Sequence, residues 1–233
     1  MGALLRQVVG EDYGVGAGLG AAVTVAQTAR DPRVTADFPA LAECCNALGS
    51  YPLRQRATVV GNLCNASPCA DTAAALLALE AELIVAGPDG ERTVPLTGFF
   101  RGPRDTALKQ GELATAVRIP AAAAKTRAVY GRLARRRGVD ISTVAVLVAA
   151  VPGAERPHRI SLLSVAPTPL RVPEAERILD ERGPDGAQDA AEAARAAASP
   201  ISDARGTAEY RRAMVGALVE RGVKSLADKE HGA

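Results

Sequence analysis

The sequence predicts a protein of the α+β class, because strand-like and helix-like segments are grouped along the chain instead of alternating. The grouping is clearest in the second half, where three strand patterns precede three helix patterns. The predicted strands are Ala128–Ala134, Val144–Val151 and Arg159–Ala166, and the predicted helices are Pro173–Glu181, Ala187–Ala198 and Asp203–Arg221. We expect a small domain of three antiparallel strands with the three helices gathered on one face.

The first half of the chain mixes short helices with strands that end in turns. Leu41, Cys44, Cys45 and Leu48 recur at helical spacing and predict one buried face of a helix over Pro39–Gly49. The remaining elements expected here are a strand ending in the glycine turn Tyr13–Gly20, a helix over Thr24–Ala29, a loop-rich stretch over Arg54–Asp71, a helix over Thr72–Ala81, a hairpin of Ala81–Ala86 and Arg92–Pro95 around the turn Gly87–Gly90, a loop over Gly98–Gly102, and a strand over Glu112–Ile119.

A domain boundary is predicted near residue 120. Pro120 stops the strand over Glu112–Ile119, and the alanine run Ala121–Ala124 follows it. We therefore expect one region over residues 1–120 and a second domain over residues 121–233.

Composition excludes several classes of protein. The 233 residues are 48% apolar and carry a net charge of +2, which is too small to indicate a nucleic-acid partner. No apolar run reaches the roughly 18–20 residues that span a bilayer, and no basic, apolar leader stands at the start. We expect a cytoplasmic protein of bacterial type, without nucleic-acid or membrane partners.

The cysteines do not predict a metal site in this chain. Four Cys and two His lack the usual spacing of a zinc site. Cys64 and Cys69 lie near Cys44 and Cys45 in an arrangement that raises the question of an iron–sulfur cluster, but adjacent residues of one helix point in different directions. Buried free thiols are the simpler interpretation.

The segment Thr58–Asp71 carries most of the chemical information. It places a glycine, two Asn, Thr, Ser and Asp in fourteen positions directly before a predicted helix. Small residues with polar side chains on a loop allow backbone N–H groups to approach an anion closely. The alternative is purely local: Asp71 caps the next helix, and Asn65 and Ser67 stabilise turns.

This segment resembles the second flavin-binding loop of the FAD-binding medium subunits of molybdenum hydroxylases, a family that includes carbon monoxide dehydrogenase and xanthine dehydrogenase. The resemblance rests on Thr-x-x-Gly-Asn followed by Asn-Ala-Ser-Pro-x-x-Asp, and it spans roughly residues 14–222. The supporting matches are Gly16-Ala17 with Val23-Thr24, Leu53–Thr58, Arg92-x-Val94-Pro95-Leu96-x-x-Phe99-Phe100, and Tyr130-x-Arg132-x-x-x-Arg136-Arg137.

The resemblance implies a fold and a set of roles. The fold is the second FAD-binding subdomain of the vanillyl-alcohol-oxidase-like type, followed by the family's small C-terminal domain. Thr58, Gly61 and Asn62 would contact the phosphates or ribitol of FAD. Asn65, Ser67 and Asp71 would line the same loop, with Asp71 directed toward the adenosine. A backbone group of Ala114 would lie against the flavin, and Arg132 would take the place of a Lys near the isoalloxazine. These eight residues are the predicted site.

The implied function is that of a flavoprotein subunit. In the family, FAD takes electrons from a [2Fe–2S] small subunit and passes them to an acceptor such as NAD or oxygen, within a complex that includes a molybdopterin large subunit. The positive charge of Arg132 would stabilise reduced, anionic flavin. Arg132 and Arg135–Arg137 form either a solvated strand end or a contact with phosphate or an acidic partner. The resemblance also implies a homo- or hetero-oligomer.

The sequence departs from the family pattern in ways that predict weakened or lost FAD. The family's first subdomain has some fifty residues and contains an Ala-Gly-Gly-Thr loop, and we expect no counterpart of that loop among these 233 residues. Val60 replaces a glycine, and its Cβ is expected to block close approach and resist positive φ. Three hypotheses follow: a working flavin subunit, an FAD-free descendant with another ligand or reaction, and a structural or assembly subunit.

Overall fold

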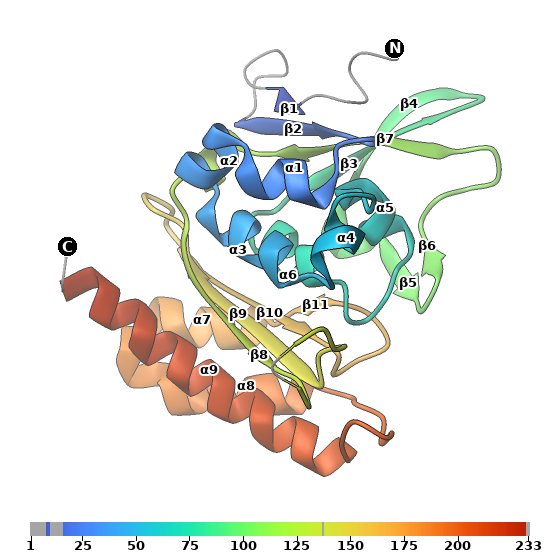
Figure 1. The fold of residues 1–233 in the computed structure, drawn as a ribbon. Coiled ribbons are helices and arrows are strands. Elements are labelled where there is room, and N and C mark those ends of the chain that lie inside the picture. Colours follow the sequence, from blue (N-terminus) through green and yellow to red (C-terminus); the bar gives the residue numbers. More distant parts are fainter. Residues whose placement is uncertain (1–7, 10–15, 137, 232–233) are drawn as a thin grey trace.

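The computed structural model describes residues 8–9, 16–136 and 138–231. Two antiparallel sheets and two groups of helices stack in alternate layers (Figure 1). The first sheet lies over the helices of the first half of the chain, and these lie on the second sheet, whose far face is covered by the C-terminal helices. The α+β class is confirmed.

The first sheet has the strand order β1 (Val8–Val9), β2 (Ala17–Gly20), β7 (Leu113–Ile119), β3 (Glu82–Gly87) and β4 (Gly90–Pro95). The predicted β3–β4 hairpin is present, and Gly90 has a φ of +109°, which favours glycine. The loop expected at Gly98–Gly102 instead contributes β5 (Phe100–Gly102), which pairs with β6 (Asp105–Thr106). That expectation was wrong.

The middle layer consists of short helices. Their bounds are α1 (Val25–Arg30), α2 (Pro32–Asp37), α3 (Pro39–Ala47), α4 (Tyr51–Arg54), α5 (Val59–Cys64) and α6 (Asp71–Ala78). All eight residues of α6 are buried, because the helix packs against α3 and the second sheet. The predicted buried face of α3, with Leu41, Cys44 and Cys45, is confirmed.

The second sheet has the order β11 (Leu170–Arg171), β10 (His158–Leu163), β9 (Val144–Ala150) and β8 (Arg127–Leu133). Every residue of β9 is buried because both faces of the sheet are covered. Ala145, Leu147 and Ala149 join the core under the middle layer, whereas alternate residues such as Val146 join the core under the C-terminal helices. Burial on both faces explains the continuous apolar run of β9. The second sheet has four strands, where the sequence predicts three.

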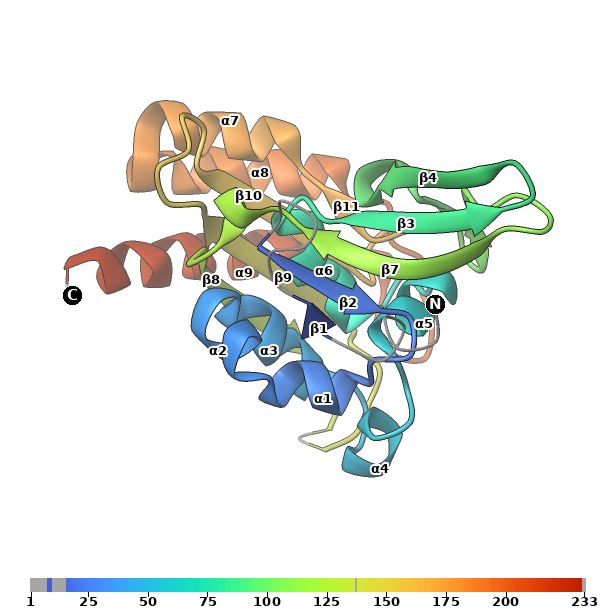
Figure 2. The same ribbon diagram turned by 90° about the horizontal axis from the view of Figure 1, so that it is seen from above.

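The last layer contains α7 (Pro173–Arg182), α8 (Ala187–Ala197) and α9 (Ala208–His231), which lie beside one another along the second sheet (Figure 2). Helix α9 approaches β9 closely: a Cβ built on Gly222 would lie 2.7 Å from Val148 Cγ2. Short 3₁₀ turns occupy Leu96–Gly98, Ala121–Ala123 and Gly183–Gly186.

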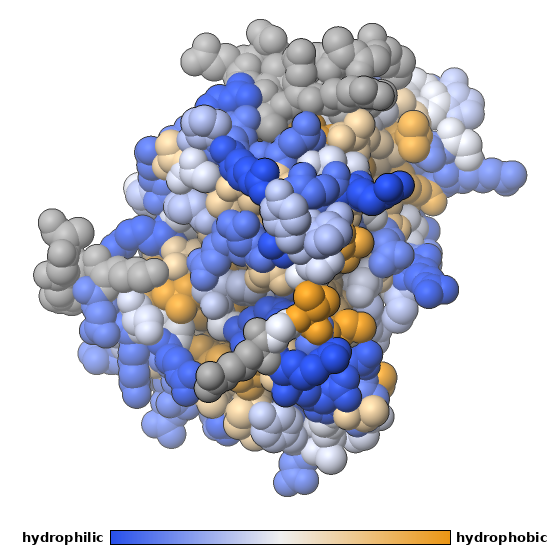
Figure 3. Space-filling view, in the orientation of Figure 1, coloured by the Kyte–Doolittle hydropathy of each residue, from blue (hydrophilic) through white to orange (hydrophobic). Residues whose placement is uncertain are grey.

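Two further expectations were wrong. Val59–Cys64 is helical instead of loop, and α9 begins at Ala208 instead of Asp203. The backbone of Asp203 forms an isolated β-bridge with Gly206. Its carboxylate accepts a hydrogen bond of 2.5 Å from Arg211 Nη2. In the described part of the chain no helix has the length and apolarity to cross a bilayer, and the face in Figure 3 is mainly hydrophilic with separate apolar spots.

Candidate functional site

The beginning of the predicted loop is organised as a helix start. The Thr58 hydroxyl accepts a hydrogen bond of 3.0 Å from the N–H of Gly61, which caps α5. A Cβ on Gly61 would lie 2.8 Å from Thr58 Oγ1, so this close approach requires glycine. Local capping therefore accounts for the Thr58 oxygen and for the Gly61 N–H.

Val60 does not obstruct this turn. The residue is part of α5, is absent from the positions with positive φ, and its side chain is 3% exposed within the hydrophobic core. The expectation that its Cβ would resist a required positive φ is corrected, because the backbone here is helical.

The rest of the segment is tied to its surroundings by hydrogen bonds. Asn62 Oδ1 accepts a bond of 2.6 Å from the Thr72 hydroxyl, which links α5 to α6. Asn65 ends α5, where its N–H donates to Gly61 O at 3.0 Å. Ser67 Oγ accepts from the N–H of Cys69 at 3.2 Å, as expected for a turn. These contacts fix the shape of the segment.

Asp71 occupies the first position of α6 and is not its cap; Ala70 is the N-cap residue and makes no side-chain bond. The Asp71 carboxylate faces β8 instead. Its Oδ1 accepts a hydrogen bond of 2.7 Å from the Tyr130 hydroxyl and lies 3.3 Å from Arg132 Nε. The capping role expected for Asp71 was therefore wrong.

The spacing Tyr130-x-Arg132 explains this convergence. Residues two apart on a strand project from the same face, so Tyr130 and Arg132 both face the middle layer. Arg132 Nη2 also donates to the carbonyl oxygen of Asp140. Its side chain is 19% exposed and that of Asp71 9%, so this is a largely buried ion pair. We call Asp71, Tyr130 and Arg132 the aspartate–arginine cluster.

Burial governs the titration of this cluster. Burial raises the pKa of Asp71, although the hydrogen bond from Tyr130 and the charge of Arg132 lower it. Burial also raises the pKa of the Tyr130 hydroxyl well above its ordinary value, and the negative charge of Asp71 adds to the effect. Tyr130 is therefore a neutral donor at pH 7.

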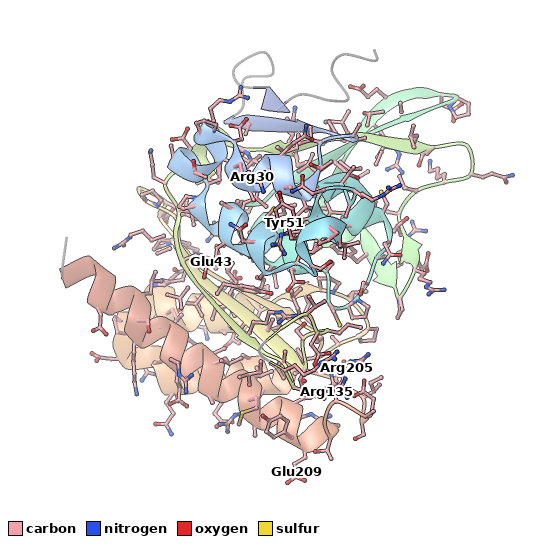
Figure 4. The ribbon with its side chains drawn as sticks, viewed as in Figure 1. Arg30, Glu43, Tyr51, Arg135, Arg205 and Glu209 are labelled. Atoms are coloured by element: carbon pink, nitrogen blue, oxygen red, sulfur yellow. The ribbon has the colours of Figure 1, made fainter. Side chains whose placement is uncertain are left out.

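The loop after β8 is basic and partly apolar. Arg135 Nη2 and Arg136 Nε lie 3.5 Å and 3.6 Å from oxygens of Asp140, while Val139 and Ile141 are exposed. Arg135 also donates to a backbone carbonyl of the turn before α9, where Arg205 lies beside it (Figure 4). The described arginines of this loop are thus anchored at one aspartate.

Ala114 lies on β7, against which α5 packs, and is 2% exposed. It pairs with Val85 next to the register shift in β3. The structure thus brings Asn62, Thr72 and the aspartate–arginine cluster around the start of α6, and places Ala114 on the sheet behind α5.

The four cysteines differ in how deeply they are buried. Cys44 and Cys45 are fully buried on α3, and burial raises the pKa of Cys45 to about 12, whereas Cys64 and Cys69 are half-buried. Among the side chains that the structure describes, no three of His, Cys, Asp or Glu are grouped so that they could hold a metal ion.

Sequence reasoning did not assign two residues of this region. The family pattern includes Tyr130 without giving it a role, and it does not include Asp140. The i, i+2 spacing of Tyr130 and Arg132 on a predicted strand was the available signal for Tyr130. Asp140 acts through its backbone carbonyl toward Arg132, which no side-chain pattern predicts.

Two known protein families match most of the chain. Residues 4–122 match the family described as FAD binding domain in molybdopterin dehydrogenase, and residues 129–226 match the CO dehydrogenase flavoprotein C-terminal domain. The carbon monoxide dehydrogenase medium chain of Hydrogenophaga pseudoflava is 36% identical over 197 residues, which are 83% of this chain and 69% of that protein.

Two more similarities cover most of the chain. The nicotine 6-hydroxylase medium subunit of Paenarthrobacter nicotinovorans is 32% identical over 91% of this chain and 75% of its own length. A solved carbon monoxide dehydrogenase from Hydrogenophaga pseudoflava, lacking the Mo-pyranopterin moiety of its cofactor, superposes with a TM-score of 0.89 at 34% identity, over 97% of this chain and 79% of that chain. This chain belongs to the family of FAD-binding medium subunits of molybdenum hydroxylases.

Proposed function

We propose that the chain binds FAD beside the aspartate–arginine cluster and relays electrons from a [2Fe–2S] partner subunit to NAD or oxygen, in a complex with a molybdopterin subunit. The observation that carries this proposal is Arg132, a cation held in place at two points and turned toward the predicted flavin loop. We also propose that the chain divides into a region over residues 1–120 and a second domain over residues 121–233.

The polar groups around the cluster are of the kind that an FAD molecule requires. Among the described residues, no hydrogen-bond partner is shown for Arg132 Nη1 or for the side-chain NH₂ of Asn62. These donors suit the oxygens of a phosphate or a flavin carbonyl. Asn65 and Ser67 lie in the same segment as Asn62, and Ala114 offers a backbone group to the flavin.

The contact between Asp71 and Arg132 changes one assigned role. The adenosine and the isoalloxazine form opposite ends of FAD, whereas these two side chains lie 3.3 Å apart. We therefore assign both residues to the isoalloxazine end. Asp71 balances the charge of Arg132 and orients its guanidinium. Thr58 and Gly61 face the cofactor only through those backbone groups that do not take part in the cap of α5.

Bound FAD supplies the chemistry of accepting two electrons singly and releasing them together, as a hydride to NAD or as electrons to oxygen. The chain's own contribution is electrostatic. Arg132 places a positive charge where negative charge develops on reduction, and burial strengthens that interaction. Asp71 limits the strength of this charge, because it is paired with the same guanidinium.

Reductive titration tests this function. The chain is co-expressed with its [2Fe–2S] and molybdopterin partners, and flavin absorbance is followed during dithionite reduction and then after addition of NAD or oxygen. We expect flavin bands that bleach and return with one of the two acceptors. A complex without flavin bands would contradict the proposal and favour the FAD-free or structural alternatives.

A further inference from the structure

The Tyr130 hydroxyl and the Arg132 guanidinium compete for one atom. Asp71 Oδ1 lies 2.7 Å from Tyr130 Oη and 3.3 Å from Arg132 Nε. The shorter bond belongs to the neutral phenol, and the longer one to the cation. The phenol therefore takes a share of the electron density that Asp71 would otherwise direct at Arg132 alone.

Arg132 is restrained on both sides of this contact. Its Nη2 donates to the Asp140 carbonyl oxygen, and its Nε points to Asp71. A guanidinium is planar, so fixing two of its nitrogens also fixes the direction of the third, Nη1. The position of Arg132 then depends on how strongly Asp71 attracts it.

The other groups around Asp71 leave the balance to these two donors. Cys44 lies near Asp71 and Tyr130, but burial raises the pKa of its thiol and keeps it neutral. Cys45 is likewise a buried neutral thiol. Among these groups, Asp71 and Arg132 form the ion pair. Tyr130 is the neutral side chain shown to donate to Asp71 Oδ1, the oxygen that Arg132 Nε also approaches.

Tyr130 also joins the two halves of the fold at this point. It projects from β8 toward the core beneath α3 and α6, and its hydroxyl reaches the first residue of α6. Similar links run nearby, since the Ser161 hydroxyl donates to Ala74 O at 2.8 Å. The phenol is thus held in place by the packing of α6 on the second sheet.

We propose that Tyr130 is a positioning residue that sets how much of the positive charge of Arg132 reaches the flavin, by sharing Asp71 Oδ1 with it. This inference rests on the proposed function. Without the phenol, Asp71 pairs with Arg132 alone, draws the guanidinium closer and neutralises more of its charge. Without the charge of Asp71, Arg132 acts on the flavin in full.

The two changes consequently have opposite signs. Tyr130→Phe stabilises the reduced flavin less, so its midpoint potential falls; Asp71→Asn stabilises it more, so its potential rises. We expect roughly tenfold in the ratio of reduced to oxidised flavin for each change, which for a two-electron couple is about 30 mV. A variant that merely loosens the fold has no reason to produce opposite shifts.

The experiment measures the flavin midpoint potential of the full FAD-loaded chain at pH 8, by spectroscopic titration against redox dyes. Wild type, Tyr130→Phe and Asp71→Asn are compared, with Tyr210→Phe as the control because Tyr210 lies on α9 and is 47% exposed. The expected result is a fall, a rise and no change, respectively.

The outcomes separate the two proposals. If wild type takes up no FAD, the proposed function fails and this inference falls with it. If wild type binds FAD but Tyr130→Phe leaves the potential within error of wild type, or shifts it in the same direction as Asp71→Asn, the role of Tyr130 is wrong while the proposed function stands.

Discussion

Removing the Asp71 carboxylate should destabilise the folded chain even in the absence of any cofactor. Asp71→Ala deletes the shared acceptor of the Tyr130 hydroxyl and Arg132 Nε, and both donors lie in a largely buried place. A buried ion pair that loses one partner leaves an uncompensated charge, which typically costs about 3–5 kcal/mol.

The expected loss in the free energy of unfolding lies at or below the lower end of that range. Arg132 keeps its bond to the Asp140 carbonyl and is 19% exposed, so water relieves part of the penalty. Removing Asp71 also removes the cost of burying its own carboxylate. We expect a loss of about 2–3 kcal/mol in the free energy of unfolding for Asp71→Ala, and roughly 1 kcal/mol for Asp71→Asn, which keeps an acceptor oxygen.

Urea unfolding followed by circular dichroism measures both values. The midpoint should fall while the slope stays unchanged, because the surface exposed on unfolding is the same. Asp71→Asn serves as the matched variant that retains the shape of the side chain. A loss below about 0.5 kcal/mol for Asp71→Ala, the size of an ordinary surface substitution, would refute the buried cluster.

The pH dependence of this variant has a defined sign. Burial raises the pKa of Asp71 above its ordinary value of 3.8, so the folded chain binds this proton more tightly than the unfolded chain. The Asp71 contribution to stability therefore increases as the pH falls from the folded pKa toward 3.8. Over this interval, the free energy of unfolding of wild type relative to that of Asp71→Asn should therefore increase as the pH falls.

Three other substitutions test separate parts of the fold. Gly61→Ala should displace the Thr58 cap and cost about 1 kcal/mol in urea unfolding, and an unchanged midpoint would contradict the cap geometry. Glu112 accepts two bonds of 2.7 Å from Arg92, which hold its pKa at about 2. Glu112→Gln should therefore lower stability at pH 7, with the deficit vanishing as the pH falls from 4.5 through about 2; a deficit independent of pH would exclude the charge as its cause. Gly222→Ala should cost about 1–3 kcal/mol through a clash of α9 with β9, and wild-type thermal stability would show that the helix can shift freely.

The parts of the fold that could be predicted from sequence have strong periodicity or a long apolar run. The run that became β9 is buried on both faces, and α3 shows its apolar spacing directly. Other elements lack such signals. Helix α5 is six residues long and includes Gly61 and Asn62, so its composition resembles a loop; β11 has two residues close to prolines at both ends.

Before the start of α9, a residue of the type that caps helices makes a different contact. Asp203 has the residue type of a helix cap, but its carboxylate bonds to Arg211 instead. The cap is nearer the helix, where the Thr207 hydroxyl accepts from the N–H of Tyr210 at 3.1 Å. Both residue types suit a cap, and the bond from Arg211 to the Asp203 carboxylate leaves the cap position to Thr207.

The residues named for the site remain a prediction, and the structure shows only how they are arranged. The loop residues were named from a pattern, and the structure places Asn62 and Asp71 together at α6. The pairing of Asp71 with Arg132 joins residues 61 positions apart and depends on how β8 packs against α6. That packing arises from side chains along both elements, which no local motif specifies.

A titration of the purified full chain with FAD, followed by flavin fluorescence, tests the central claim most directly. We predict saturable one-to-one binding that weakens about tenfold in Arg132→Ala, since a charged hydrogen bond is worth roughly 1.5 kcal/mol or more. Fluorescence that never saturates, or an Arg132→Ala variant that binds FAD as tightly as wild type, would contradict the account.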